Sequence, residues 1–218
     1  MAALLTLAGY FGPWVPHRVA GLVITGLDLG EYVKFLPVVR SGQVMLWREA
    51  FYLPLVTVSL LLSMSAFRAR LRYGWLLRML LLGLAVVAAL NLLPPAWSAA
   101  TFHNPEFHQQ VIALAVCLAA VVISPFLALL PRGPIAALLL ALSLGALWFP
   151  LRDFYQVHPA IVELYNHALP LGWGVYVMSL GLLLVAVIQW LELKENFDAS
   201  RGNKRPAPHA GERNRLDG

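Results

Sequence analysis

The feature that most constrains this chain is a series of long apolar blocks that carry almost no charge. Five such blocks of 17–21 residues occur, at residues 50–66, 73–93, 111–130, 135–151 and 171–191. A helix of about 20 apolar residues crosses the hydrocarbon core of a bilayer, whereas a run of about 10–14 is more typical of a helix in a protein core. We therefore expect each block to be a membrane-spanning helix.

Composition supports a membrane protein and excludes a water-soluble globule. Of the 218 residues, 60% are hydrophobic and 12% are charged. Soluble domains contain about 45–50% apolar and about 25% charged residues. A chain this apolar has too little polar surface to cover a globule in water.

Residues 1–12 are also apolar, but they contain no basic n-region and no clear cleavage site, so we expect no cleaved signal peptide. As a helix they would reach only about 18 Å, less than the bilayer core. Three interpretations stay open: a half-span, a helix that continues past Pro13, or a start that lies further upstream.

The distribution of Lys and Arg predicts the orientation of the helices. Eleven of the 16 basic residues fall on one side of the predicted spans. They are Arg68, Arg70, Arg72, Arg78, Arg132, Lys194, Arg201, Lys204, Arg205, Arg213 and Arg215. Because basic residues favour the cytoplasmic side, we expect an all-α bundle over residues 1–193 with five or six spans and both termini in the cytoplasm. The inner (plasma) membrane is the expected location.

Residues 194–218 contain few apolar side chains and both signs of charge. Such a segment buries too little surface to offset its ordering entropy, so we expect a disordered, basic cytoplasmic tail.

Two short helices are expected to lie at the extracytoplasmic surface. The first covers residues 19–36, where Thr25, Asp28, Glu31 and Lys34 recur every three residues as a polar stripe. The simpler interpretation is a solvated stripe with a Glu31–Lys34 pair, and it is favoured. Alternatively, Asp28 and Glu31, one turn apart, would bind a cation or carry protons.

The second covers residues 159–169, with Pro159 at its start and Pro170 just beyond its end. On this helix Glu163 and His167 lie four residues apart and would share a face. An acid–base pair and an ordinary interfacial anchor are both compatible with that spacing, and the interfacial anchor is favoured.

Residues 101–110 hold a predicted helix start between two histidines. We expect Asn104 to cap the helix N-terminus, Pro105 to occupy the first helical position, and Glu106 to face the positive end of the helix dipole. His103 and His108 flank this start at a spacing of five, which differs from the i, i+4 spacing of a helical zinc pair. Capping and hydrogen bonding are favoured over metal ligation.

These segments define one predicted polar cluster on the outer face. Its members are His103, His108, His158, Glu163, His167, Asp28 and Glu31. The four histidines would be the metal ligands if the cluster binds a metal or haem. No cofactor is predicted otherwise, since nucleotide, haem-attachment and nucleophile-elbow motifs are absent from the sequence, and the lone Cys117 excludes zinc sites that need two cysteines.

The favoured function is a non-catalytic, permease-like or accessory subunit of a membrane transport complex. Its partners would be the lipid bilayer and other membrane subunits or an ATPase subunit, and no nucleic acid. In layout the chain resembles the transmembrane subunit of a type-2 ABC exporter, without a matching motif. Ala137, Ala141 and Gly145 form a small-residue stripe suited to close helix contact. Packing inside the bundle is favoured over contact with a partner subunit. The alternative function is an extracytoplasmic His/carboxylate site for metal, haem or acid–base chemistry.

Overall fold

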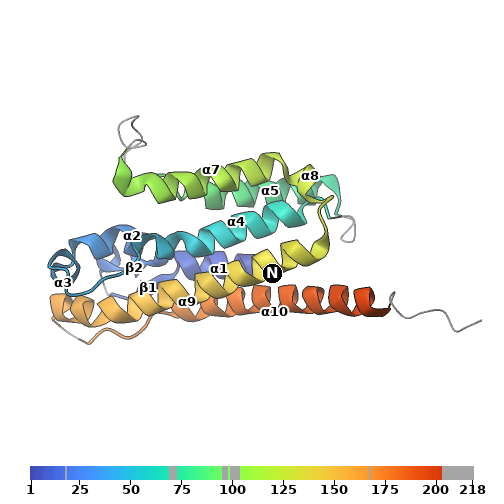
Figure 1. The fold of residues 1–218 in the computed structure, drawn as a ribbon. Helices are drawn as coiled ribbons and strands as arrows, with labels where there is room; N and C mark the ends of the chain where they lie inside the picture. Colours follow the sequence, from blue (N-terminus) through green and yellow to red (C-terminus); the bar gives the residue numbers. More distant parts are fainter. Residues whose placement is uncertain (18, 69–72, 95–97, 99–103, 167, 203–218) are drawn as a thin grey trace, which may run out of the picture.

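The computed structural model describes residues 1–17, 19–68, 73–94, 98, 104–166 and 168–202, and it is mostly helical. Among these residues, six helices of ten or more residues lie side by side in one elongated bundle (Figure 1). They are α1 (Ala2–Phe11), α4 (Leu53–Ser65), α5 (Trp75–Leu90), α7 (His108–Val122), α9 (Arg132–Tyr165) and α10 (Trp173–Gly202). The predicted helical class is confirmed, apart from one small pair of strands.

Three helices are long and apolar enough to cross a membrane, and they cover Pro105–Val122, Arg132–Tyr165 and Trp173–Ser200. Helices α1, α4 and α5 are apolar but shorter, with 10, 13 and 16 residues. At 1.5 Å per residue, α1 reaches only about 15 Å. Length and composition alone thus support three spans, and the others stay predictions.

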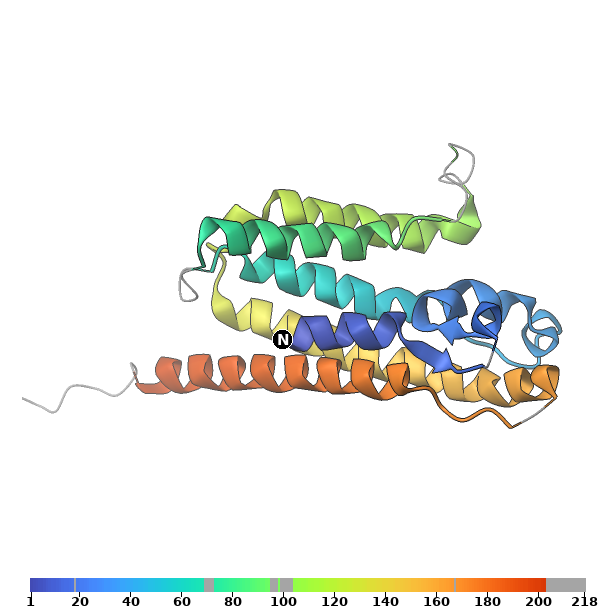
Figure 2. The same ribbon diagram turned by 180° about the vertical axis from the view of Figure 1, so that it is seen from behind.

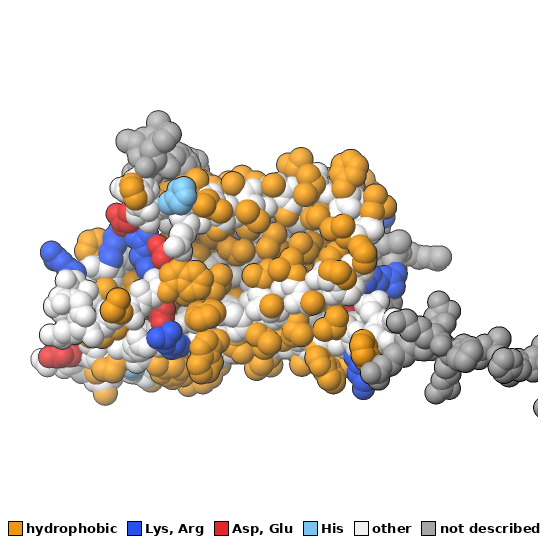
Figure 3. All heavy atoms as spheres, viewed as in Figure 1, with side chains coloured by type: hydrophobic (Ala, Val, Ile, Leu, Met, Phe, Trp, Pro, Cys, Tyr) orange, Lys and Arg blue, Asp and Glu red, His pale blue; other side chains and the backbone are white. Residues whose placement is uncertain are grey.

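Helix α4 lies at the centre of the bundle and contacts α1, α5, α7 and α9. Most of its side chains are buried, because it has neighbours on several sides. Helices α9 and α10 pack along each other. Helix α1 also packs against α10, on the face of the bundle that Figure 2 shows in front. Exposed apolar side chains cover the length of the bundle, while charged side chains gather toward its two ends (Figure 3).

The α1–α10 contact depends on glycine. A Cβ atom built on Gly9 would lie 2.0 Å from the backbone nitrogen of Met178, and one on Gly181 would lie 2.5 Å from the backbone nitrogen of Thr6. Small residues let two backbones approach closely, which is how helices associate where lipid removes the hydrophobic driving force.

The prediction of a single helix over residues 19–36 is wrong. A 3-10 turn at Ala20–Leu22 is followed by strand β2 (Ile24–Thr25), which pairs antiparallel with β1 (Pro13–Val15). Helix α2 (Gly26–Tyr32) then begins, and a 3-10 turn, η2 (Val33–Phe35), follows it. The helix starts late because the Thr25 side chain accepts a hydrogen bond from the backbone N–H of Asp28, and the Asp28 carboxylate accepts one from the N–H of Thr25.

The prediction of a separate short helix over residues 159–169 is also wrong. Helix α9 runs through Pro150 and Pro159 and ends at Tyr165, with Asn166 in the left-handed conformation at φ 53°. Phe154, Val157 and Ile161 are buried on both sides of Pro159. This continuous buried face holds the helix together although proline removes a backbone donor.

The predicted disordered tail begins too early. Helix α10 continues from its apolar part through residues 194–202. Within this stretch the Asn196 amide donates to the carbonyl of Glu192 over 2.7 Å. Residues 203–218 lie outside the described part of the chain, so their predicted disorder stays a prediction.

Candidate functional site

Charged and polar side chains from several elements meet at one end of the bundle. They come from α2, η2, the 3-10 turn η3 (Arg48–Tyr52) and the 3-10 turn η5 (Pro105–Phe107). We call the following six residues the polar network: Glu31, Lys34, Arg48, Glu49, Tyr52 and Glu106.

Arg48 joins η3 to η5. Its Nη1 donates to Glu106 Oε1 over 2.7 Å, and its Nη2 donates to the backbone carbonyl of Glu106 over 2.7 Å. The same Nη2 lies 3.1 Å from Glu49 Oε1. The side chain of Arg48 is only 12% exposed, so these charge-assisted bonds satisfy a cation that has lost most of its water.

Lys34 and Tyr52 share the carboxylate of Glu31. Lys34 Nζ lies 2.6 Å from Glu31 Oε2, which confirms the predicted Glu31–Lys34 pair. The Tyr52 hydroxyl donates to Glu31 Oε1 over 3.2 Å. Both oxygens of Glu31 therefore have partners, and Lys34 reaches onward to Glu106 Oε1 at 3.4 Å.

An aromatic ring lies beneath the two cations. Lys34 Nζ is 5.8 Å and the Arg48 guanidinium 5.5 Å from the centroid of the Phe107 ring, both within cation–π range. Burial lowers the pKa of Lys34, but its contacts with Glu31 and Glu106 outweigh this, so the pKa lies above its ordinary value of 10.5. Lys34 is therefore held as a cation across the physiological range of pH.

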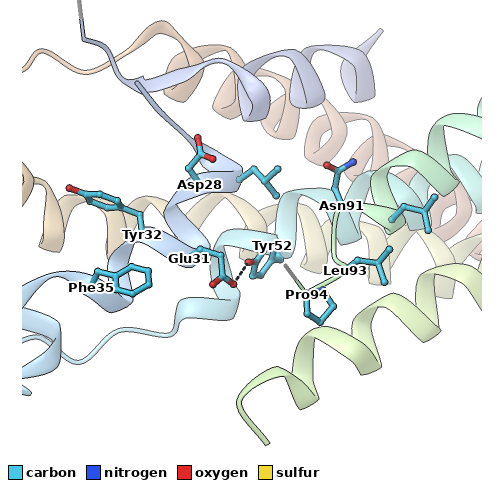
Figure 4. A pocket seen from close by; sticks show the side chains of 10 residues that line it. Asp28, Glu31, Tyr32, Phe35, Tyr52, Asn91, Leu93 and Pro94 are labelled. Carbon is cyan, nitrogen blue, oxygen red and sulfur yellow. Dashed lines mark hydrogen bonds between the residues drawn. The ribbon is translucent and has the colours of Figure 1, made fainter. Parts of the chain in front are cut away.

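A cavity of about 520 Å³ opens beside the polar network. Figure 4 shows its lining, with Glu31 and Tyr52 pointing toward each other and Asp28, Tyr32 and Asn91 around them. The Asp28 carboxylate accepts hydrogen bonds from the backbone N–H and the hydroxyl of Thr25. Its role in this structure is to cap α2.

Trp47, the residue directly before η3, forms a second hydrogen-bonded link, to α9. The backbone N–H of Trp47 donates to Asp153 Oδ2 over 3.1 Å, and the indole N–H of Trp47 donates to Gln109 over 3.0 Å. Asp153 is only 2% exposed, and this bond supplies a partner for a carboxylate inside the bundle.

The histidines of the predicted cluster do not come together in the described part of the chain. His108 begins α7 and is exposed. His158 lies on α9 with its ring edge against Phe154, and its Nε2 is buried without a hydrogen-bond partner among the described residues. His103 and His167 lie outside the described residues, so the predicted Glu163–His167 pair stays untested, and Glu163 itself is exposed.

Metal binding in particular receives no support from these positions. Among the described residues, no group of three or more His, Cys, Asp or Glu side chains is arranged to hold a metal ion. The arrangement that does exist consists of paired acids and bases. Chemically, its ion pairs and hydrogen bonds link α2, η2, η3 and η5.

Sequence reasoning identified parts of this site and missed others. The predicted helix start is confirmed, since Asn104 accepts a hydrogen bond from the N–H of Glu106 over 3.0 Å with Pro105 in the first turn. The capping box at Thr25 and Asp28 was missed, although a Thr followed three residues later by an acidic residue is a sequence pattern for it. Arg48 was missed as well, and no local pattern marks a partner 58 residues away.

Comparison with family models, with curated proteins and with solved structures found no match to this chain.

Proposed function

We propose that this protein is a multi-pass integral membrane protein that acts as a non-catalytic, permease-like or accessory subunit of a membrane transport complex. The observation that carries the membrane part is the exposed surface of the long helices. Less than half of each of the three spanning windows is buried within the chain, although all three are apolar. Lipid tails or neighbouring membrane helices would cover such faces, whereas water would not.

The proposed orientation keeps the polar network outside the cell and the basic end inside. Arg68, which pairs with Glu192 at 2.6 Å, marks the basic end of the bundle. The excess of Lys and Arg at this end supports a cytoplasmic location for the basic end and for both termini. The membrane would be the inner membrane.

The subunit part of the proposal draws support from the small-residue stripe on α9. Ala137 and Ala141 are exposed, and Gly145 is half-buried, with no atom of another helix within ordinary contact distance of a Cβ built on it. Within the described part of the chain the stripe therefore stays largely uncovered, which does not support the favoured prediction of internal packing. A helix from another membrane subunit would fit against it, because small residues allow close approach.

Co-purification tests this proposal. The full chain, tagged, should stay in the membrane fraction after a carbonate wash. After cross-linking in its native membrane and purification in mild detergent, it should co-purify with a second membrane polypeptide. Ala141→Leu should reduce the amount of that partner at least severalfold, because the larger side chain blocks close helix contact. Ala115→Leu, at an exposed alanine of α7, is the matched control and should retain it.

Two results would contradict the proposal. Release of the protein by carbonate would remove the membrane part. A monodisperse protein that carries no partner after cross-linking, or equal partner recovery with Ala141→Leu and Ala115→Leu, would remove the subunit part.

The alternative, a His/carboxylate site for metal, haem or acid–base chemistry, gains no specific observation from the described residues. Metal analysis and an absorption spectrum of the purified protein decide it. Stoichiometric metal or haem would favour the alternative over the non-catalytic subunit.

A further inference from the structure

A groove runs along the outside of the bundle between α9 and α10. Its volume is about 840 Å³, within the range of about 300–1,000 Å³ found for ligand sites. Most of the lining is apolar, from Leu144, Leu147, Trp148 and Leu151 on α9 and Leu183 on α10. The hydroxyl of Ser179, which also lines the groove, donates to the carbonyl of Val175 over 2.7 Å and is already satisfied.

One end of the groove is cationic and polar. Arg152, Tyr155 and Gln156 line it there, and Arg152 directly follows the last leucine of the apolar part of α9. Arg152 is exposed and forms no ion pair with another described residue. The next residue, Asp153, is 2% exposed, and its carboxylate attracts the Arg152 guanidinium from beyond ion-pair distance.

The length of the apolar part matches one leaflet of a bilayer. From Leu144 to Arg152 the helix rises about 12 Å, at 1.5 Å per residue. Half of the hydrocarbon core is about 15 Å thick. A partner helix would need an apolar groove through both leaflets, whereas two exposed and two half-buried leucines over one leaflet suit a single acyl chain.

We propose that this groove binds an anionic phospholipid, with an acyl chain along the leucines and the phosphate at Arg152. The lipid belongs to the leaflet at the polar-network end of the bundle. Arginine suits a phosphate because its fork of donors contacts two oxygens at once, and Tyr155 and Gln156 add donors beside it. The inference rests on the membrane part of the proposed function and is independent of any protein partner.

Native mass spectrometry of the full chain, purified in detergent and delipidated, tests the headgroup contact. The probes are dioleoyl phosphatidylglycerol and dioleoyl phosphatidylcholine. The wild type should bind the anionic lipid about fivefold more tightly than the zwitterionic one, the effect expected of one basic residue near the membrane surface. Arg152→Gln should remove the preference, and Arg40→Gln, at an exposed arginine outside the groove, should keep it.

A second pair of variants tests the acyl-chain contact. Leu183→Trp fills the groove and should weaken binding of both lipids, whereas Leu180→Trp, at an exposed position on the same helix outside the groove, should not. Equal affinity of the wild type for the two lipids, a preference that survives Arg152→Gln, or normal binding by Leu183→Trp would each overturn the proposal.

Carbonate washing distinguishes this failure from failure of the proposed function. If the protein stays in the membrane but shows no lipid preference, only the lipid-site proposal fails. If carbonate releases the protein, both proposals fail.

Discussion

The contact between α1 and α10 is held by backbone against backbone, whereas the polar network is held by side chains that reach across several elements. At the first, a Cβ on Gly174 would lie 2.6 Å from the carbonyl oxygen of Gly9. At the second, Lys34 and Arg48 share one carboxylate oxygen of Glu106, Oε1. In the α1–α10 contact no side chain can rotate to relieve a clash. In the polar network a charged side chain that loses one partner keeps another. The two regions should therefore differ in how they tolerate change.

The largest effect is expected at the α1–α10 contact. Gly181→Leu places side-chain atoms where the backbone of Thr6 lies, and no rotamer change relieves that clash. We expect a loss of about 3 kcal/mol in the free energy of unfolding, at the upper end for overpacking. Thermal unfolding in detergent, followed by circular dichroism, measures it.

Gly83→Leu is the control for this change. Gly83 lies on α5, and a Cβ built there meets no atom within 4 Å. Its substitution should leave the unfolding temperature unchanged or raise it slightly, since glycine is a poor helix former. An equal loss in both variants would show that glycine contact does not define the α1–α10 region.

An intermediate effect is expected from Arg48→Gln. The change removes the cation from Glu49 and leaves Glu106 with Lys34 alone. The Arg48 side chain is only 12% exposed, so water replaces its bonds poorly. Loss of charge-assisted bonds there should destabilise the fold by about 2 kcal/mol. Arg40→Gln, at an exposed arginine with no ion pair among the described residues, should stay within about 0.5 kcal/mol of the wild type. Denaturant titration of the two variants compares them.

The smallest effect is expected from Lys34→Gln. Lys34 and Glu106 are 31% and 44% exposed as side chains, and exposed ion pairs contribute about 0–1 kcal/mol. Glu31 also keeps its hydrogen bond from Tyr52. A loss above about 2 kcal/mol would mean that the network does not redistribute its partners, and the contrast with the α1–α10 contact would fail.

The same variant gives a pH dependence with a defined sign. The pKa of Lys34 is raised above 10.5 in the folded protein, so the folded state binds the proton more tightly than the unfolded state. The stabilisation by Lys34 is therefore complete below pH 10.5 and is lost as the pH rises through the folded-state pKa. The difference in unfolding free energy between wild type and Lys34→Gln should shrink over that window. A difference that grows with pH would contradict the assigned pairing.

Features that depend on short spacing could be predicted from the sequence. The Glu31–Lys34 pair spans three residues and the Asn104–Glu106 cap spans two, so a single turn of backbone brings the partners together. The apolar blocks likewise predicted helices, because a long apolar run in lipid must satisfy its backbone hydrogen bonds internally. The bounds of the two predicted short helices were wrong. The capping box at Thr25 sets the start of α2 later than predicted. A buried face continues α9 past Pro159, where a new helix was predicted.

By itself the sequence determined that this chain is helical, apolar and basic at one side, since composition and local period are enough for that. Only the tertiary structure decided that Arg48 meets Glu106 and that Trp47 meets Asp153, partners 58 and 106 residues apart. It alone also decided that α1 lies against α10 and that a groove ends at Arg152. The physical reason is that such contacts form when packing closes long loops, and residue spacing along the chain carries no record of which loops close.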